Sequence, residues 1–284
     1  MDEIEIEDDW DEVVPYKGPY YSSGGKPILV DSYCLFMDIL GYSQAVKKSV
    51  ENGNAREEFG NFYKAIYRLK DSLSGKDNAV MLTKGGRDNI TVDWEVLTFS
   101  DNLVFGIPSI QIGIDRFYMI TVDISRIQYE LALKGYFVRG GISTGLLFMD
   151  HRIVYGPALI DAHHLESTIA VYPRIVLSKN LRDLYPGDPF LMRDSDGTIF
   201  LDYLENACTE YPDSIDGWWL DWSAVDIHRI LIEKRLKEFA YHPRIRSKYC
   251  WLARYHNAFC DRHKDMEDYH PSLNVDKKYI GNLD

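Results

Sequence analysis

Apolar residues in the first half of the chain are spaced as in one buried strand and two long helices. Residues 32–39 (SYCLFMDI) are apolar except near their ends, which predicts a buried strand. Gly41 and Ser43 follow and indicate a turn into a helix. Helical spacing then places two sets of residues on single apolar faces. The first set is Phe59, Phe62, Ile66, Leu69 and Leu73, and the second is Phe117, Ile120, Ile124, Ile127 and Leu131, ending near Gly135.

The segments between and after these helices predict a mixed sheet. They are a loop at 84–89 (KGGRDN), hairpin arms at 91–99 and 102–108, a strand pair at 136–148 and 152–156, a helix from Ala158 to about Ala170, and a strand at 174–178. This order predicts an α+β fold, an antiparallel-rich sheet layered by helices. It contains the βαββαβ pattern of ferredoxin-like or polymerase-palm domains.

We therefore expect three parts along the chain. Residues 1–30 are acidic, then rich in Tyr, Gly, Ser and Pro, and predict a loosely ordered lead-in. Residues 31–180 form the predicted core. Residues 181–284 predict an elaboration packed on the same domain, because no Pro- or Gly-rich linker precedes them. It should contain a Trp-rich loop at 216–222 (DGWWLDW) and helices near 224–240 and 246–264.

Charge and cysteine content narrow the function classes. The 284 residues carry a formal net charge of −12, whereas nucleic-acid binding needs a basic footprint. Four cysteines in a chain this long do not predict a disulfide framework. The N-terminus has no signal-peptide pattern, and no run approaches the roughly 20 apolar residues of a membrane helix. We expect a cytoplasmic protein with neither a nucleic-acid nor a membrane partner.

Two aspartates are placed where a metal could bind. Asp38 interrupts the end of an apolar strand, and Asp101 lies at the hairpin turn. If that strand neighbours the hairpin, both carboxylates meet at one edge and suit Mg²⁺ or Mn²⁺, with the backbone carbonyl of Ile39 as a third ligand. Residues 40–43, Leu40, Gly41, Tyr42 and Ser43, would present free N–H groups at a helix start to phosphate oxygens. Taken alone, an aspartate at the position of Asp38 is more often a helix cap or turn residue than a metal ligand, and Asp101 is an ordinary turn residue.

Four segments, in order, carry a resemblance to a known family. Residues 36–43 (FMDILGYS) and 99–102 (FSDN) resemble the two metal motifs of the class III nucleotidyl cyclases. Residues 138–145 (VRGGISTG) and 155–167 (YGPALIDAHHLES) resemble two further motifs of that family. The resemblance covers about residues 33–180.

The resemblance implies that Asp38 and Asp101 are catalytic and hold two Mn²⁺ or Mg²⁺ ions. One ion would acidify the ribose 3′-hydroxyl, and the other would bind the triphosphate and the leaving pyrophosphate. The product would be a 3′,5′-cyclic mononucleotide.

The residues at the expected nucleotide-binding positions depart from the purine cyclases. The two base-selecting positions fall at Leu97 and Pro157, whose side chains cannot hydrogen-bond a purine. The ribose-orienting Asn and the transition-state Arg of the family fall at Ile160 and His164. The purine readout expected of the family is therefore missing.

Other side chains near these positions could compensate. His164, with His163 or Asp161, could substitute in part, and Arg139 or Arg174 could supply positive charge.

A closer resemblance is to the bacterial pyrimidine cyclases of Pycsar antiphage defence. It rests on the segments above together with residues 172–178 (YPRIVLS) and 248–259 (KYCWLARYHNAF). It implies a homodimer with its sites near the interface, a cyclic pyrimidine nucleotide as product, and a separate effector protein that binds this product. UTP is the substrate favoured, with CTP as the alternative. Tyr42 would be a neighbour of the base, or else a core aromatic residue.

Three other hypotheses remain. The chain could be a cyclase-like sensor that binds a nucleotide without turnover, although both aspartates are retained. A polymerase-palm cyclase that joins two GTP molecules is disfavoured, because no GG[DE]EF-type loop occurs at the hairpin. Metal binding by Cys250, His256, Cys260 and His263 is disfavoured because their spacing fits no familiar zinc pattern.

Overall fold

The computed structural model describes residues 18–73, 79–83, 86–90, 94–109, 115–184, 187–210, 218–268 and 279–281. In chain order the elements of the first half are β1 (Val30–Ile39), α1 (Tyr42–Glu51), α2 (Ala55–Leu73), β2 (Ala79–Thr83), β3 (Gly86–Ile90), β4 (Glu95–Phe99), β5 (Asn102–Pro108), α3 (Asp115–Ala132), β6 (Val138–Met149) and β7 (Val154–Tyr155). They continue as α4 (Pro157–His164), the π-helix η2 (Leu165–Ile169), β8 (Ile175–Leu177), α5 (Lys179–Leu184), β9 (Leu191–Arg193), β10 (Ile199–Leu201), the 3₁₀ helix η3 (Tyr203–Ala207), β11 (Cys208–Glu210), β12 (Trp218–Leu220), α6 (Trp222–Glu238), α7 (Pro243–Arg262) and β13 (Glu267–Asp268).

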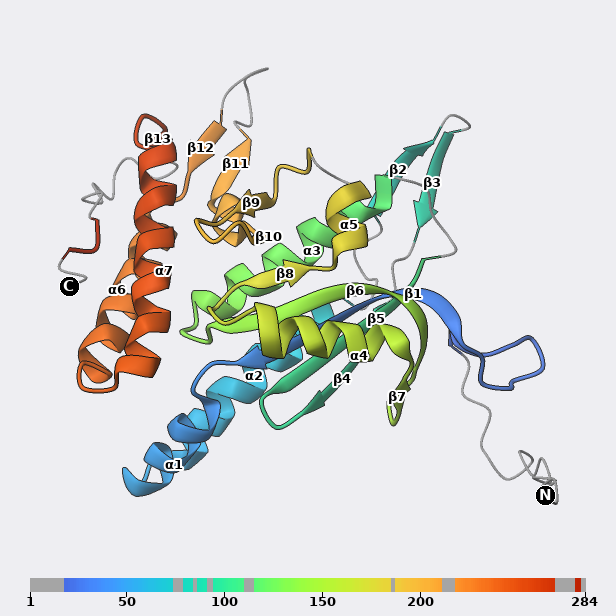
Figure 1. The fold of residues 1–284 in the computed structure, drawn as a ribbon, viewed down its shortest axis with the longest axis horizontal. Helices are drawn as coiled ribbons and strands as arrows, with labels where there is room; N and C mark the ends of the chain where they lie inside the picture. The colour runs from blue at the N-terminus through green and yellow to red at the C-terminus, as the bar shows by residue number, and fades with distance from the viewer. Residues whose placement is uncertain are drawn as a thin grey trace.

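The main sheet has the strand order β4-β5-β1-β6-β8-β10-β9, and β7 pairs with β6 beside this path (Figure 1). β1 is an interior strand and pairs antiparallel with both β5 and β6. The register places Asp38 opposite Asn102 on one side and opposite Arg139 on the other. The α+β class and the βαββαβ core of the sequence prediction are confirmed, since β4-β5-β1-β6 is the order of a split βαβ sheet.

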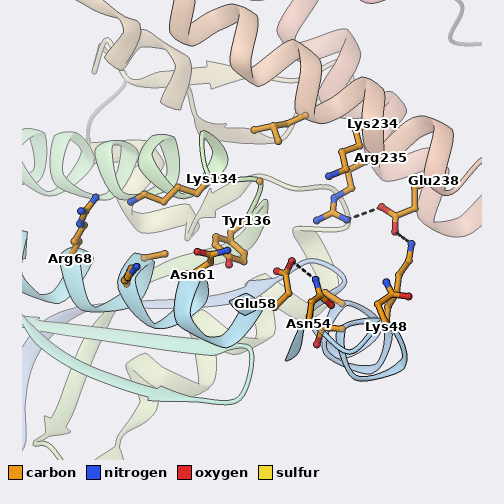
Figure 2. Close-up of a pocket in the computed structure, with 17 residues that line it drawn as sticks. Lys48, Asn54, Glu58, Asn61, Arg68, Lys134, Tyr136, Lys234, Arg235 and Glu238 are labelled. Atoms are coloured by element: carbon orange, nitrogen blue, oxygen red, sulfur yellow. Dashed lines mark hydrogen bonds and ion pairs between the residues drawn. The ribbon is translucent and has the colours of Figure 1, made fainter. Parts of the chain in front are cut away.

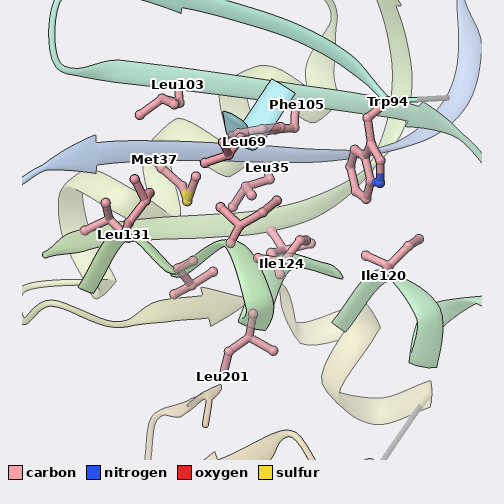
Figure 3. Packing of buried hydrophobic residues seen from close by; sticks show 14 of the residues in the cluster. Leu35, Met37, Leu69, Trp94, Leu103, Phe105, Ile120, Ile124, Leu131 and Leu201 are labelled. Atoms are coloured by element: carbon pink, nitrogen blue, oxygen red, sulfur yellow. The ribbon is translucent and has the colours of Figure 1, made fainter. Parts of the chain in front are cut away.

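Alternation along β1 divides the core into two layers. Leu35, Met37 and Ile39 face α2 and α3 and belong to the largest buried cluster, part of which is drawn in Figure 3. Cys34 and Phe36 face the opposite side and pack with Ala158 and Ala162 of α4. Asp38 continues this second set by the same alternation, so it emerges on the side that α4 and η2 cover.

Small residues allow α4 and η2 to lie directly on the sheet. A Cβ added to Gly141 of β6 would lie 2.4 Å from the Ala162 carbonyl oxygen and 2.5 Å from Cβ of Leu165. Figure 1 shows α4 running across this face of the sheet. The close approach carries η2, and Glu166 with it, over the end of β1 where Asp38 lies.

The C-terminal part extends the sheet and adds its own buried cluster. β10 pairs with β8 and β9, and α6 packs against α7. Their cluster includes Phe200, Trp222, Trp251 and Phe259. Figure 1 shows α6 and α7 side by side at one end of the molecule. The predicted helices near 224–240 and 246–264 are confirmed as α6 and α7.

Three expectations from the sequence need correction. Residues 86–89, expected in a loop, belong to β3, which pairs with β2. Residues 218–220 of the expected Trp-rich loop form β12, because β11 and β13 flank it. Phe59 does not share the buried face of α2 but is 67% exposed, and its ring contacts the exposed Tyr63 at a centroid distance of 6.1 Å.

Within the described part of the expected lead-in, two tyrosines contact the body of the protein, whereas Ile28 and Leu29 are exposed. Tyr20 is fully buried in the cluster beneath α4, and Tyr21 donates a hydrogen bond to Asp150 at 2.8 Å. Residues 1–17 lie outside the described residues. Among the described helices, none is both long and apolar enough for a membrane span.

Candidate active site

Asp38 and Asp101 lie at the same end of two neighbouring strands. The Ile39 backbone N–H donates a hydrogen bond to the Asp101 carbonyl oxygen at 3.0 Å, which ties the hairpin turn to the end of β1. The Asp101 carboxylate accepts a hydrogen bond from the Asn102 amide at 3.4 Å. The juxtaposition predicted from the sequence is therefore present, although catalytic and metal-binding roles for Asp38, Ile39 and Asp101 stay predictions.

A strained turn presents Asp101. Phe99 pairs with Asn102, which leaves Ser100 and Asp101 as a two-residue hairpin loop. Ser100 has a φ of 56°, the only positive value at a described residue other than glycine. Two-residue hairpin turns need positive φ because their twist must match that of the strands. The turn is thus built from a residue that adopts this conformation at a cost.

Arg139 bridges two carboxylates beneath η2. Its Nε donates to Asp38 Oδ2 at 2.9 Å, and its Nη2 forms an ion pair with Glu166 Oε1 at 2.7 Å. Burial raises the pKa of Asp38 and of Glu166, and Arg139 opposes this rise in both cases. The predicted nucleotide-binding Arg139 therefore lies beside Asp38, where it already holds two acidic partners.

Lys248 of α7 adds a second cation. Burial lowers the pKa of Lys248, and the charge of Arg139 lowers it further, while Asp38 and Glu166 raise it. Neither Lys248 nor Glu166 was expected at this site from the sequence. Glu166 could have been proposed from the sequence, because it belongs to the YGPALIDAHHLES segment that carries the family resemblance. The residues around Lys248 give no sign that it approaches Asp38.

The residues at this end of the sheet fit a divalent cation. Asp38 and Asp101 supply hard oxygen donors from adjacent strands. The charge of Asp101 adds to the burial that raises the pKa of Asp38, so a cation between them would remove a repulsion. Within the part of the chain described, these two carboxylates do not belong to a group of three ligand side chains within 4.8 Å. Further ligands would come from a backbone carbonyl or from substrate oxygens.

The start of α1 lies next to these carboxylates. Gly41 is its N-cap, with a φ of 77°. Among the described residues, the amides of Gly41, Tyr42 and Ser43 have no hydrogen-bond acceptor, as expected for a first helical turn. The prediction of a free N–H at Leu40 is wrong, because this N–H donates a hydrogen bond to the Phe137 carbonyl oxygen at 2.8 Å. Three of the four amides thus stay available to an anion.

The ring of Tyr42 packs against Phe62 with a centroid distance of 5.2 Å and lies on the main buried cluster. This contact favours the core-aromatic interpretation over a neighbour of the base.

The other predicted nucleotide-binding residues lie on two elements. Leu97 of β4 is partly buried and packs against the cluster beneath α4. Pro157, Ile160 and His164 lie on exposed positions of α4, and Ile160 is 68% exposed. His163 is exposed and packs edge-on against Phe36 at 5.0 Å. Pro157, Ile160 and His164 are thus open to solvent, whereas His163 contacts Phe36 of β1.

Arg174 cannot serve as a charge donor to substrate. Its side chain is 2% exposed and bonds Asp194 and Asp196, with Asp196 at 2.6 Å. Its guanidinium also lies 5.4 Å and 5.9 Å from the ring centroids of Tyr172 and Trp251. Arg174 therefore joins the C-terminal elements to the sheet.

The four residues weighed as a zinc set do not come together. His256 contacts Cys260 at 3.5 Å and His228 at 3.1 Å, whereas His263 contacts Glu205 at 2.9 Å. Glu205, Cys208 and His263 are close enough to share a cation. Arg262, 3.1 Å from Glu205, already supplies positive charge there.

Comparisons with known proteins give distant structural matches. No protein-family model matches the sequence, and the comparison with curated proteins finds no similar sequence. The monomeric guanylyl cyclase domain of the RhoGC fusion protein from the aquatic fungus Blastocladiella emersonii aligns with a TM-score of 0.44 and 14% identity, over 61% of this chain and 95% of that chain.

The catalytic core of a rhodopsin-guanylyl cyclase with converted specificity, in complex with ATPalphaS, aligns with a TM-score of 0.41 and 16% identity over 61% of this chain and 95% of that chain. A bacterial light-regulated adenylyl cyclase aligns with a TM-score of 0.39 and 15% identity, over 72% of this chain and 57% of that chain. Similarity this distant carries no conclusion about the family or activity of this chain.

Proposed function

We propose that this chain is a nucleotidyl cyclase that converts a pyrimidine nucleoside triphosphate into a 3′,5′-cyclic mononucleotide and pyrophosphate. One observation carries the proposal. Asp38 and Asp101 meet at the end of adjacent strands, beside the cations Arg139 and Lys248 and the first turn of α1. Acidic ligands for metal ions, positive charge and free amides are what a reaction on a triphosphate requires.

In the proposed site each part of the chain has one task. Asp38 and Asp101 hold Mg²⁺ or Mn²⁺, two ions in all, which when bound acidify the ribose 3′-hydroxyl and neutralise phosphate charge. The free amides of Gly41, Tyr42 and Ser43 bind phosphate oxygens at the positive end of α1. Arg139 and Lys248 balance the negative charge that develops on the leaving pyrophosphate.

The pyrimidine preference rests on the residues that resemble base-selecting positions. Leu97 offers an apolar surface and Pro157 offers no side-chain hydrogen bond, so neither reads a purine edge. UTP is the proposed substrate and CTP the alternative. Production of a second messenger in antiphage defence, read by a separate effector, rests on the sequence resemblance alone.

We propose a homodimer because the residues assigned to the nucleotide lie on outward-facing positions. Ile160 and His164 are exposed on α4, whereas Asp38 lies beneath η2. A second copy could present its α4 to the nucleotide held at Asp38. Activity per protomer is then expected to fall on dilution.

A product assay tests the activity and the base together. Purified protein is incubated with each of the four ribonucleoside triphosphates and Mn²⁺, and products are identified by mass. The double variant Asp38→Asn, Asp101→Asn should lose at least about a hundredfold in rate, because its metal ligands are gone. Asp31→Asn, an exposed aspartate on the same strand, is the matched control and should keep the activity.

The possible products separate the hypotheses. A cyclic pyrimidine nucleotide from wild type and control alone supports the proposal and identifies the base. A cyclic purine nucleotide would support cyclase activity but would reject the pyrimidine specificity inferred from Leu97 and Pro157. An activity that survives the double variant overturns the proposed site.

A non-catalytic nucleotide sensor is the second candidate. It is favoured by the direct bond from Arg139 to Asp38, which occupies one oxygen of a proposed metal ligand. This hypothesis requires that no cyclic product forms from any triphosphate, while calorimetry still detects nucleotide binding.

A further inference from the structure

A second concave surface lies apart from the proposed active site. It is a groove of about 910 Å³ bounded by α1 and α2, by α6 and by the turn that follows α3 (Figure 2). None of Asp38, Asp101, Arg139 and Glu166 lines it. This volume is within the range of small-molecule sites. We call this surface the basic groove.

The groove concentrates positive charge in an acidic protein. Its basic lining residues are Lys48, Lys64, Arg68, Lys134, Lys234 and Arg235. Its acidic lining residues are Glu58 and Glu238. The whole chain has a net charge of −12, so this surface differs in sign from the molecule around it.

Most of this positive charge is not neutralised within the groove. Glu238 binds Lys48 at 2.7 Å and Arg235 at 2.8 Å, so one carboxylate serves two cations at one end (Figure 2). The other four basic residues, Lys64, Arg68, Lys134 and Lys234, form no ion pair with any residue in the described part of the chain.

These cations come from opposite walls. Arg68 belongs to α2, Lys134 to the turn after α3, and Lys234 to α6. Figure 2 shows Arg68 and Lys134 close together at one end and Lys234 beside Arg235 toward the other. Like charges on facing walls repel each other, and an anion between them would convert that repulsion into attraction. Asn54 and Asn61 add neutral polar groups to the same surface.

We propose that the basic groove binds a compact anion carrying several phosphate groups, independently of a metal ion. Four cations that form no ion pair within the described part of the chain match the charge of a polyphosphate chain, free or attached to a nucleoside. A long nucleic acid fits less well, because its phosphates would continue past the groove onto a protein whose net charge is −12. The proposal does not depend on the cyclase activity, since the groove shares none of the four residues of that site named above.

Calorimetry on the full chain in EDTA tests the proposal with two probes, sodium tripolyphosphate and UTP. The wild type should bind at least one of them, and tighter binding of UTP would identify a nucleotide as the source of the phosphates. Lys134→Gln, Lys234→Gln should weaken binding at least about tenfold, because charge-assisted contacts are lost. Lys64→Gln, Arg68→Gln provides the same test from the facing wall. Lys237→Gln, on α6 outside the groove, should bind as the wild type does.

Four results would overturn the proposal. They are no binding of either probe without metal, an equal loss in Lys237→Gln, full binding in both double variants, and displacement of the probe by a duplex RNA that binds more tightly. In EDTA the Asp38→Asn, Asp101→Asn variant should bind each probe as the wild type does. Failure of the groove and failure of the cyclase proposal are therefore distinguishable.

Discussion

At the scale of single residues, Arg139 lies between two carboxylates whose pKa values are raised by burial. Its guanidinium is the cation that Asp38 and Glu166 contact directly, at 2.9 Å and 2.7 Å. Each acidic group would be more costly to keep ionised without it, because buried charges require a partner. The bridge thus links β1, β6 and η2 at the point where the proposed metal ligands lie.

Replacing Arg139 by Met should therefore destabilise the fold. We expect the free energy of unfolding at pH 7 to fall by about 2 kcal/mol, because two carboxylates lose their shared cation. The loss should shrink toward pH 5. Without Arg139 the pKa values of Asp38 and Glu166 lie further above their unfolded values, so the folded variant takes up protons on acidification and the buried negative charge disappears. Urea unfolding at both pH values measures this.

The matched control is Arg126→Met. Arg126 is exposed and pairs with Asp123 at 3.2 Å within one helix. Such a surface pair contributes at most about 0.5 kcal/mol. Equal losses in the two variants would show that the Arg139 bridge has no special role in stability.

At the scale of elements, the fit of α4 and η2 on β6 sets where Glu166 and the exposed side of α4 lie. Gly141 makes this fit possible, because its missing Cβ leaves room for the backbone of Ala162. The constraint comes from backbone atoms rather than from the end of a flexible side chain, so the helix would have to shift as a whole.

Gly141→Ala should accordingly lower the free energy of unfolding by about 2 kcal/mol, as overpacking in a close-packed interior does. Gly60→Ala is the control, since Gly60 lies inside α2 with no atom within 4 Å of an added Cβ. That change should stabilise the protein by up to about 1 kcal/mol, because Ala favours helix. Thermal or urea unfolding of both variants checks the contrast, and a neutral Gly141→Ala would contradict the packing argument.

At the scale of the whole molecule, a buried histidine pair joins the C-terminal helices. His228 of α6 and His256 of α7 are fully buried, with their Nδ1 atoms 3.1 Å apart. The Tyr203 hydroxyl lies 2.7 Å from Nε2 of His228. Burial, with a contribution from His256, lowers the pKa of His228 well below its usual value.

The stability of the protein should therefore depend on pH just below neutrality. Because the folded His228 stays neutral while the unfolded one gains a proton below its pKa of about 6.5, acidification favours unfolding by up to about 1.4 kcal/mol per pH unit. Asp202 has the opposite effect, since burial raises its pKa to about 6 and the folded state then gains the proton. The decline should thus be steepest between about pH 7 and pH 6.

The variant His228→Gln isolates this contribution. It cannot titrate in this range, so the slope of the unfolding free energy between about pH 7 and pH 6 should decrease. His164→Gln, at an exposed histidine of α4, should keep the wild-type slope. Denaturant titrations across this pH range measure the slope. An unchanged slope in His228→Gln would show that His228 does not cause the pH dependence.

Local periodicity was sufficient to predict most of the elements that surround the site. The apolar run before Asp38, the two-residue turn at Ser100 and Asp101, and the apolar face of α3 each depend on residues close together in the chain. Short-range geometry determines strand and helix patterns, so these predictions needed no knowledge of distant contacts. Residues 86–89 and β12 were missed because their pairing depends on partners that the pattern does not identify.

The sequence by itself determined the α+β class, the βαββαβ order of elements along the chain, and the expectation that Asp38 and Asp101 meet. Only the tertiary structure decided which charged residues join them. Arg139 and Arg174 are indistinguishable as sequence positions, yet one contacts Asp38 and the other is buried against Trp251. Lys248 and the cations of the basic groove likewise come together from segments far apart in the chain. The physical reason is that charge interactions depend on distance and burial in the folded chain, which long-range packing sets and local pattern does not.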